Sequence, residues 1–243
     1  MSKIYVVGLG PGGIEQMTPR ALDAIKSSDV VTGYDYYISL IKPYIGDKEI
    51  FSTPMTKETE RCKKTLEFAL NGKTVAMVSS GDSGVYGMAG IIYQVCAQHP
   101  EVEIEVIPGV TACCSAAAVL GAPLIHDFAV ISLSDRLTPW DKIQLRLALA
   151  AQADFVICLY NPSSKTRADY LKKACEILLE YKSEDTPCGY VRNIGRDGEQ
   201  YGIMALNEMK DFNADMFTTI IIGNSRTEII NGKLVTPRGY KNI

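Results

Sequence analysis

The chain has few of the side chains on which acid–base and metal catalysis usually depend. Its 243 residues include two histidines, His99 and His126, and seven cysteines, none of which forms a C-x-x-C pair. A zinc site built from cysteine and histidine is therefore not expected, and we expect no protein-bound metal. The scattered and odd-numbered cysteines indicate reduced thiols in a cytoplasmic protein, several of them on core faces.

Long runs of one kind of residue are also missing. No stretch of about 18 apolar residues occurs, which argues against a membrane-spanning helix, and the first residues lack the apolar region and cleavage site of a signal peptide. The formal net charge is −3, and no basic tract is long enough to follow a nucleic-acid backbone, so nucleic acid is not an expected partner. With 47% hydrophobic and 22% charged residues, the composition is that of an ordinary globular protein.

Apolar runs of strand length alternate with helical patterns along most of the chain. Strands are expected at 3–8, 29–33, 73–82, 103–109, 126–134, 153–162, 187–193, 199–206 and 217–225. Helices are expected at 18–29, 57–72, 87–98, 110–121, 138–152 and 165–181. The alternation predicts an α/β protein with a mostly parallel sheet, and the nearly consecutive closing strands indicate a mixed sheet in the second half.

A linker-like GAPL begins at residue 121, where Gly and Pro separate two apolar segments. We therefore expect two α/β domains, 1–120 and 121–243. Sites commonly lie between such domains, so the functional site is expected in the cleft between them.

The stretch GLGPGG at 8–13 follows the first expected strand and fits the letter of the dinucleotide pattern G-x-G-x-x-G. The residues in and after this stretch argue against a dinucleotide site, because Pro11 lacks the N–H that a phosphate cradle would use. The expected N-cap, Thr18, comes five residues after Gly13, so no helix N-terminus lies at the turn to hold a pyrophosphate. Three interpretations stay open: a dinucleotide site, a tight turn without a ligand, and a turn that binds another small cofactor through its backbone, which is favoured.

Two further segments combine glycine with other small residues after an expected strand. In SSGDSGVYG at 79–87, Asp82 could accept hydrogen bonds from a ribose or an amino group, although taken alone it is more typical of a turn or cap. In PGVTACCSAAA at 108–118, the small side chains allow close approach of a ligand, and tight helix–sheet packing explains them equally well.

Taken together and in this order, GLGPG, the G-D-x-x-x-Y pattern at 81–86 and PGVTA at 108–112 resemble the tetrapyrrole methyltransferase family, the S-adenosylmethionine enzymes of sirohaem and cobalamin synthesis. SLSDRLTPW (132–140), LYNPSSKTR (159–167) and VRNIGRDGE (191–199) resemble the branch that methylates C-17 of precorrin-3B or of its cobalt-containing counterpart. The resemblance implies two α/β domains with the cofactor in the cleft, a homodimer, and a tetrapyrrole substrate with several carboxylates. It also implies ring contraction with lactone formation, and S-adenosylhomocysteine as product.

The resemblance also implies roles for particular residues. The cofactor-binding residues would be Gly10, Pro11, Gly81, Asp82, Val85, Thr111, Ala112, Tyr160 and Gly189. Candidates for handling the proton of lactone formation are Ser134, Asp135, Asn161 and His126. Candidates for binding the substrate carboxylates are Arg136, Lys165, Arg167, Arg192 and Arg196.

Each of these catalytic and substrate assignments has a structural alternative. Asp135 or Thr138 could cap the helix expected near Pro139, Asn161 could belong to a turn, His126 could be a structural histidine, and the arginines could lie on a solvated face. For the whole protein, the alternatives are another regiospecific methyltransferase of the same family, an NAD-dependent oxidoreductase and a non-enzymatic binding protein. The sequence does not decide whether the substrate carries cobalt.

Overall fold

The computed structural model describes residues 2–164 and 166–241, so Lys165 lies outside the described residues. The chain forms two compact units, Met1–Ala112 and Cys113–Ile243. Both units combine helices with a β-sheet, so the α/β class expected from the sequence is confirmed.

The first unit is a five-stranded parallel sheet with strand order β3-β2-β4-β1-β5. Its strands are β1 (Lys3–Gly8), β2 (Val30–Tyr34), β3 (Glu49–Thr53), β4 (Thr74–Ser79) and β5 (Glu103–Ile107). Its helices are α1 (Pro19–Ser27), α2 (Asp35–Ile45), α3 (Glu58–Leu70) and α4 (Ala89–Val95), with a short 3-10 helix at Ile14–Gln16. The Thr18 side chain accepts a hydrogen bond from the Ala21 N–H at 3.1 Å, which confirms the expected N-cap of α1.

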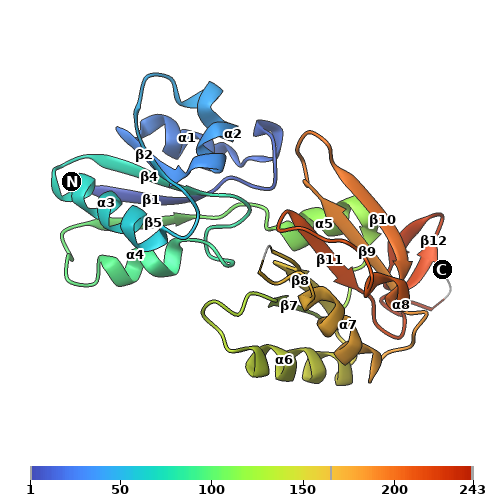
Figure 1. Cartoon of the computed structure of the whole chain (residues 1–243). Coiled ribbons are helices and arrows are strands. Elements are labelled where there is room, and N and C mark those ends of the chain that lie inside the picture. Colours follow the sequence, from blue (N-terminus) through green and yellow to red (C-terminus); the bar gives the residue numbers. More distant parts are fainter. Residues whose placement is uncertain (1, 165, 242–243) are drawn as a thin grey trace. The chain divides into compact units, whose positions relative to one another are not determined.

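Helices cover both faces of this sheet (Figure 1). Apolar side chains of α1 and α2 pack with Val7 and Val31 on one face, and those of α3 and α4 pack with Ile4 and Val6 on the other. Strands β1 and β4 are neighbours, yet the chain leaves β1 for α1 and leaves β4 for α4. Loops that diverge in this way open a crevice at the carboxyl ends of the two strands, which is where open α/β sheets usually bind ligands.

Two elements of this unit were not expected from the sequence. Helix α2 carries Pro43 inside it, and a proline weakens the helical pattern from which a helix is recognised. Strand β3 lies at the edge of the sheet and has mostly exposed side chains, so it lacks the apolar run that marks the central strands.

The second unit is built on a mixed five-stranded sheet with strand order β10-β9-β11-β8-β7. Its strands are β7 (Phe128–Ser132), β8 (Val156–Tyr160), β9 (Pro187–Arg192), β10 (Gln200–Ala205) and β11 (Thr218–Ile222). Its helices are α5 (Ala112–Leu120), α6 (Trp140–Gln152), α7 (Tyr170–Leu179) and α8 (Leu206–Met209), and a small sheet joins β6 (Gly121–Ala122), β12 (Glu228–Ile230) and β13 (Lys233–Val235). Strands β7 and β8 are parallel, whereas β9 is antiparallel to both β10 and β11, which confirms the mixed sheet.

Helix α5 goes with the second unit, whereas the sequence suggested a boundary after residue 120. Its last residue, Leu120, packs against Gly189 of β9, where a Cβ would come 2.6 Å from Leu120 Cδ1. The Lys233 ammonium also donates to the Val119 carbonyl at 2.8 Å. The boundary therefore follows contacts with distant strands, and the linker-like composition at 121 does not mark it.

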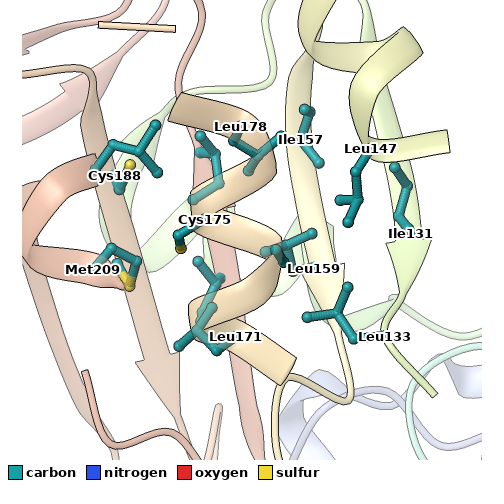
Figure 2. Close-up of a cluster of buried hydrophobic side chains, with 14 of the residues drawn as sticks. Ile131, Leu133, Leu147, Ile157, Leu159, Leu171, Cys175, Leu178, Cys188 and Met209 are labelled. Carbon is teal, nitrogen blue, oxygen red and sulfur yellow. The ribbon is translucent and has the colours of Figure 1, made fainter. Parts of the chain in front are cut away.

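Helix α7 supplies the centre of the apolar core on the opposite face of this sheet. Figure 2 shows Leu171, Cys175 and Leu178 of α7 beside Leu159 of β8, with Met209 on the other side of the helix. All five are at most 2% exposed. Such a core is stabilised by roughly 1.5–3 kcal/mol for each large side chain removed from water, which gives the loops at the strand ends a rigid base.

The seven free thiols give a direct test of this packing. Six of the cysteines are buried and Cys114 is exposed; burial raises the pKa of Cys62 and of Cys175 to about 12. A disulfide reagent must reach the sulfur to react. We therefore expect only the exposed Cys114 to react rapidly at pH 8 in the native protein, although its pKa is raised and that of the buried Cys113 is lowered to about 6, and all seven thiols to react after unfolding. Cys114→Ser should remove the rapid reaction, and rapid modification of a second thiol would contradict the buried placements.

Candidate functional site

Three glycines meet at the carboxyl ends of β1, β4 and β5. A Cβ on Gly109 would lie 2.2 Å from the Gly81 carbonyl oxygen, and a Cβ on Gly8 would lie 2.6 Å from the Gly109 nitrogen. Gly10 and Gly81 exchange backbone hydrogen bonds of 3.0 and 2.7 Å. Both adopt positive φ angles, 73° and 66°, which glycine allows at little cost. The three glycine-rich segments of the sequence therefore form one backbone cradle.

Asp82 holds two of these segments together. Its Oδ1 accepts hydrogen bonds from the N–H groups of Gly84 at 2.7 Å and Val85 at 3.1 Å, and its Oδ2 accepts from the Gly109 N–H at 3.0 Å. The turn role considered for Asp82 is thus present, and it reaches across to the segment after β5. An ionised carboxylate offers about four acceptor positions, so one remains for a ligand.

The surroundings of the cradle lack the parts of a dinucleotide site. A 3-10 helix at Ile14–Gln16 follows the glycine turn, and α1 begins only at Pro19. The nearby loops instead expose the apolar side chains of Val85 and Val110, while Thr111 and Ala112 are half-buried. Backbone groups and apolar side chains at this position suit a ligand that has no phosphate.

In the second unit, the loops after β7 and β8 interlock. The Ser132 hydroxyl accepts hydrogen bonds from Asn161 Nδ2 at 2.9 Å and from the Ser134 N–H at 3.2 Å. Asn161 has φ +54°, the turn conformation that this residue tolerates well. Parallel β7 and β8 bring their carboxyl ends to one edge of the sheet, which explains how Ser134 and Asn161 come together from motifs far apart in sequence.

Asp135 is the charged centre of this loop cluster. Its Oδ2 accepts a hydrogen bond from the Tyr170 hydroxyl at 2.6 Å, and its Oδ1 lies 3.2 Å from Arg167 Nη1, which also donates to the Ser134 hydroxyl at 2.9 Å. The Tyr170 hydrogen bond and the Arg167 charge lower the pKa of the Asp135 carboxyl, and the same hydrogen bond raises the pKa of Tyr170. At neutral pH the pair therefore presents an ionised acceptor beside a protonated hydroxyl.

The helix-capping alternative for Asp135 and Thr138 is wrong. The N-cap of α6 is Pro139, and no side chain makes a capping hydrogen bond to it. The Asp135 carboxylate is instead bound by Arg167 and Tyr170 through charge-assisted hydrogen bonds.

Tyr160 and Gly189 flank helix α5 within the second unit. The Tyr160 hydroxyl accepts a hydrogen bond from the Cys113 N–H at 2.7 Å, so it binds one of the open N–H groups in the first turn of α5. Gly189 makes room for Leu120. Both residues therefore have a structural role of their own in positioning α5 on the sheet.

The remaining candidate residues differ in their contacts and exposure. Arg192 pairs with Asp215 at 3.2 Å and donates to the Asn213 carbonyl at 2.6 Å. Arg196 lies in the turn after β9, and Arg136 is exposed. His126 precedes β7 and accepts a hydrogen bond from the neighbouring Asp127 N–H at 3.0 Å. It lies at the amino end of β7, opposite the edge that carries Ser134, so this unit does not bring it to the loop cluster.

Sequence reasoning missed two residues with unusual surroundings, Tyr170 in the loop cluster and Arg61 in α3. Tyr170 is the first residue of α7, and its place in the helical pattern gave no reason to single it out. Its position three residues after Arg167, where a loop meets a helix, is a signal from which it could have been found. Arg61 of α3 is 3% exposed, and nothing in its charged surroundings in the sequence indicated burial.

The lowered pKa of Asp135 predicts a pH dependence. Because the folded-state pKa lies below that of the unfolded chain, ionised Asp135 stabilises the fold fully above about pH 4, and this contribution is lost as the pH falls through the folded-state pKa. We expect the difference in Tm between the parent protein and Asp135→Asn to be largest near pH 7 and to shrink below about pH 4. A difference that does not change between these pH values would contradict the assignment.

Neither a metal-binding cluster nor a membrane-spanning helix is found in the part of the chain that the structure describes. Among the residues placed by the structure, no group of three or more His, Cys, Asp and Glu side chains could hold a metal ion. Over the same ranges, no helix has the length and apolar character needed to cross a membrane.

The chain is similar to known proteins over the segments that carry these motifs. A family model described as Tetrapyrrole (Corrin/Porphyrin) Methylases matches residues 3–210. A cobalt-factor III methyltransferase of Priestia megaterium is 46% identical over 98% of the chain and 45% of its own length. A probable cobalt-factor III C(17)-methyltransferase of Salmonella typhimurium is 45% identical over 98% of the chain and 99% of its own length. The crystal structure of the methyltransferase CobJ is similar with a TM-score of 0.92 and 34% identity, covering 98% of this chain and all of that one.

The chain thus spans less than half of the first of these relatives and nearly all of the second. The similarity to the second covers both units, including the cradle and the loop cluster. It is this match, over nearly the whole of both chains, that bears on function.

Proposed function

Because the chain belongs to the tetrapyrrole (corrin/porphyrin) methylase family, we propose that it is an S-adenosylmethionine-dependent C-methyltransferase of cobalamin biosynthesis. Its substrate is precorrin-3B or the cobalt-containing counterpart, it methylates C-17, and ring contraction with lactone formation accompanies the transfer. The observation that carries this proposal is the nearly full-length match, at 45% identity, to a relative named as a C(17)-methyltransferase.

The glycine cradle of the first unit fits S-adenosylmethionine. This cofactor has no phosphate, so the missing N–H of Pro11 and the late start of α1 at Pro19 are no obstacle to its binding. Glycines at 8, 81 and 109 let three backbone segments approach one another without intervening side chains, and Asp82 has an acceptor position left for a hydroxyl or amino group. When bound, the cofactor supplies a methyl group already activated on a sulfonium.

The cofactor-binding set that we propose comes from both units. In the first unit it consists of Gly10, Pro11, Gly81, Asp82, Val85, Thr111 and Ala112, and in the second of Tyr160 and Gly189. The chain's own task is to fix the donor and the acceptor in position, which in such reactions replaces much of the need for acid–base groups.

The loop cluster of the second unit suits the proton chemistry of lactone formation. Asp135 stays ionised and can accept a hydrogen bond, while the Ser134 hydroxyl and the Asn161 amide lie in the same network. Fixed dipoles of this kind stabilise charge that develops during a reaction. We assign Ser134, Asp135 and Asn161 to this step and leave His126 out, because it lies at the other end of β7.

The basic residues near the strand ends have separate tasks. Arg167 and Arg192 mainly hold their own loops, because each is bound to a carboxylate of the chain. We assign Arg136, Arg196 and Lys165 to the carboxylates of the substrate. The protein works as a cytoplasmic homodimer that needs neither nucleic acid nor a membrane, and the seven free thiols accord with a reducing compartment.

Calorimetry and turnover test this function together. S-adenosylhomocysteine is expected to bind and NADH to give no heat, because the cradle lacks a phosphate site. The protein should transfer a methyl group to the reduced macrocycle, and mass and NMR analysis of the product from metal-free and cobalt-loaded substrate should locate that group at C-17 and identify the natural substrate. Binding of NADH without S-adenosylhomocysteine, or a methyl group at another carbon, would refute the proposal.

A further inference from the structure

A cavity lies in the first unit, next to the glycine cradle, and its walls include part of the 79–87 loop. Its volume is about 160 Å³, several times the roughly 30 Å³ that a water molecule occupies in the liquid. It is formed at the carboxyl ends of β2 and β4 and at the start of α3, and its walls include Tyr34, Tyr37, Glu58, Arg61, Ser79 and Tyr86.

Arg61 is a buried cation that lacks an anion within the described chain. Its side chain lines the cavity and the residue is 3% exposed, yet its Nε has no hydrogen-bond partner among the described residues. No ion pair to its guanidinium is found within these residues either. A buried charge without a partner costs several kcal/mol, so such an arginine is expected to receive an anion from outside the chain.

Hydroxyl groups around Arg61 are also left unpaired. Ser79 Oγ, at the end of β4, has no partner within the described ranges, and neither does Thr53 Oγ1 at the end of β3. Thr53 lies beside Tyr34 in the sheet, so these hydroxyls belong to the same edge. Thr53 does not itself line the cavity, whereas Arg61 and Ser79 both do. Buried polar atoms are normally paired, so the unpaired Arg61 Nε and Ser79 Oγ in one cavity wall indicate a bound polar group.

The charges of the cavity favour a carboxylate over a phosphate. Arg61 is its one cation and Glu58 its one acidic side chain, and the Glu58 carboxylate already accepts a hydrogen bond from the Thr56 N–H at 3.0 Å. A single guanidinium can pair with one carboxylate, whereas a phosphate would place a second negative charge in a cavity that already contains Glu58. The planar fork of arginine also matches a carboxylate in two parallel hydrogen bonds.

We propose that this cavity binds one carboxylate arm of the macrocyclic substrate, with Arg61 as the residue that pairs with it. The inference rests on the proposed function for the identity of the ligand, while the unpaired guanidinium calls for an anion in either case. The cavity and the 79–87 loop share Ser79 and Tyr86, and the same loop carries Asp82. An arm held by Arg61 therefore fixes the attached ring next to the cofactor-binding loop and contributes to the choice of the methylated carbon.

Kinetics of Arg61→Gln and Arg61→Lys test the proposal. We expect KM for the macrocycle to rise at least about tenfold in Arg61→Gln, as loss of one charge-assisted pair implies, and the dissociation constant of S-adenosylhomocysteine to change less than about twofold. Arg61→Lys keeps the charge but loses the planar fork of the guanidinium, so its KM should lie between those of the parent protein and Arg61→Gln. The matched control is Lys63→Gln, which removes one positive charge from an exposed position on the same helix and should leave KM unchanged.

Stability and direct binding separate this proposal from the proposed reaction. Removing an unpaired buried charge should leave the Tm of Arg61→Gln unchanged or raise it, and Ser79→Ala is a second variant with a smaller expected rise in KM. Uroporphyrin, a stable polycarboxylate macrocycle, should bind the parent protein at least about tenfold more tightly than Arg61→Gln, and sodium propionate should raise the Tm of the parent but not that of Arg61→Gln.

Weaker uroporphyrin binding by Arg61→Gln without any methyl transfer by the parent protein would refute the reaction and support the cavity. Unchanged KM and unchanged uroporphyrin binding in a folded Arg61→Gln would overturn the cavity assignment.

Discussion

Replacement of Asp82 by alanine is expected to weaken binding of S-adenosylhomocysteine about 30- to 100-fold. The carboxylate accepts three backbone hydrogen bonds, from Gly84, Val85 and Gly109, and hydrogen bonds to charged groups each contribute about 1.5–3 kcal/mol. Water replaces part of this loss because the residue is half-buried, so a net cost of about 2–3 kcal/mol is expected. The loop it holds is the one to which we assign cofactor contacts.

Asp135→Ala is the matched control, because it removes a carboxylate from the loop cluster of the other unit. Calorimetry should show less than about a threefold change in the dissociation constant for this variant. Asp82→Asn retains one acceptor oxygen and should give an intermediate value. Equal effects of Asp82→Ala and Asp135→Ala, or a larger effect of the latter, would contradict the assigned cofactor site.

The largest effect on stability is expected for Gly109→Ala. The new Cβ would lie 2.2 Å from the Gly81 carbonyl oxygen and 2.7 Å from the Gly8 backbone. These neighbours are backbone atoms in or next to the ends of β1 and β4, so they cannot rotate away as a side chain could. Overpacking costs typically 1–3 kcal/mol and more where nothing can move, so we expect a Tm lower by roughly 10 °C and no measurable binding of S-adenosylhomocysteine.

Gly90→Ala provides the contrasting variant in the same unit. Gly90 lies in α4, and a Cβ there would meet no atom within 4 Å. Alanine is the better helix former, so this change should stabilise the protein by about 0.5–1 kcal/mol. Differential scanning calorimetry compares the two variants, and a Gly109→Ala protein as stable as Gly90→Ala would show that the glycines are not packed against one another as described.

The sequence indicated much of the site because local patterns encode where strands end. Gly8, Gly81 and Gly109 each follow an apolar run, and parallel strands carry their carboxyl ends to one edge, so their meeting could be expected. The same reasoning applies to Ser134 and Asn161, which follow the parallel strands β7 and β8 and come together in the structure. Pro11 and Thr18 were sufficient to argue against a dinucleotide site, because a missing N–H and a helix start are local properties.

The sequence could not reveal the partners of the charged side chains. Asp135 was considered as a helix cap, but the structure binds it to Arg167 and Tyr170, because α7 returns to the edge of the sheet. Arg61 reads as one of several charges in a helix, and only its burial against the ends of β2 and β4 turns it into a candidate anion site.

By itself, the sequence determined the α/β class, the family resemblance and the positions of the glycine-rich and polar loops at the ends of strands. These follow from composition and from hydrophobic periodicity, which act over a few residues. Only the tertiary structure decided that α5 packs with the second unit, that Asp82 binds Gly109 and that Arg61 is buried with no ion pair to any residue that the structure describes. Each of these depends on contacts between segments far apart in the chain, and no local pattern specifies which distant backbone or side chain a polar group will meet.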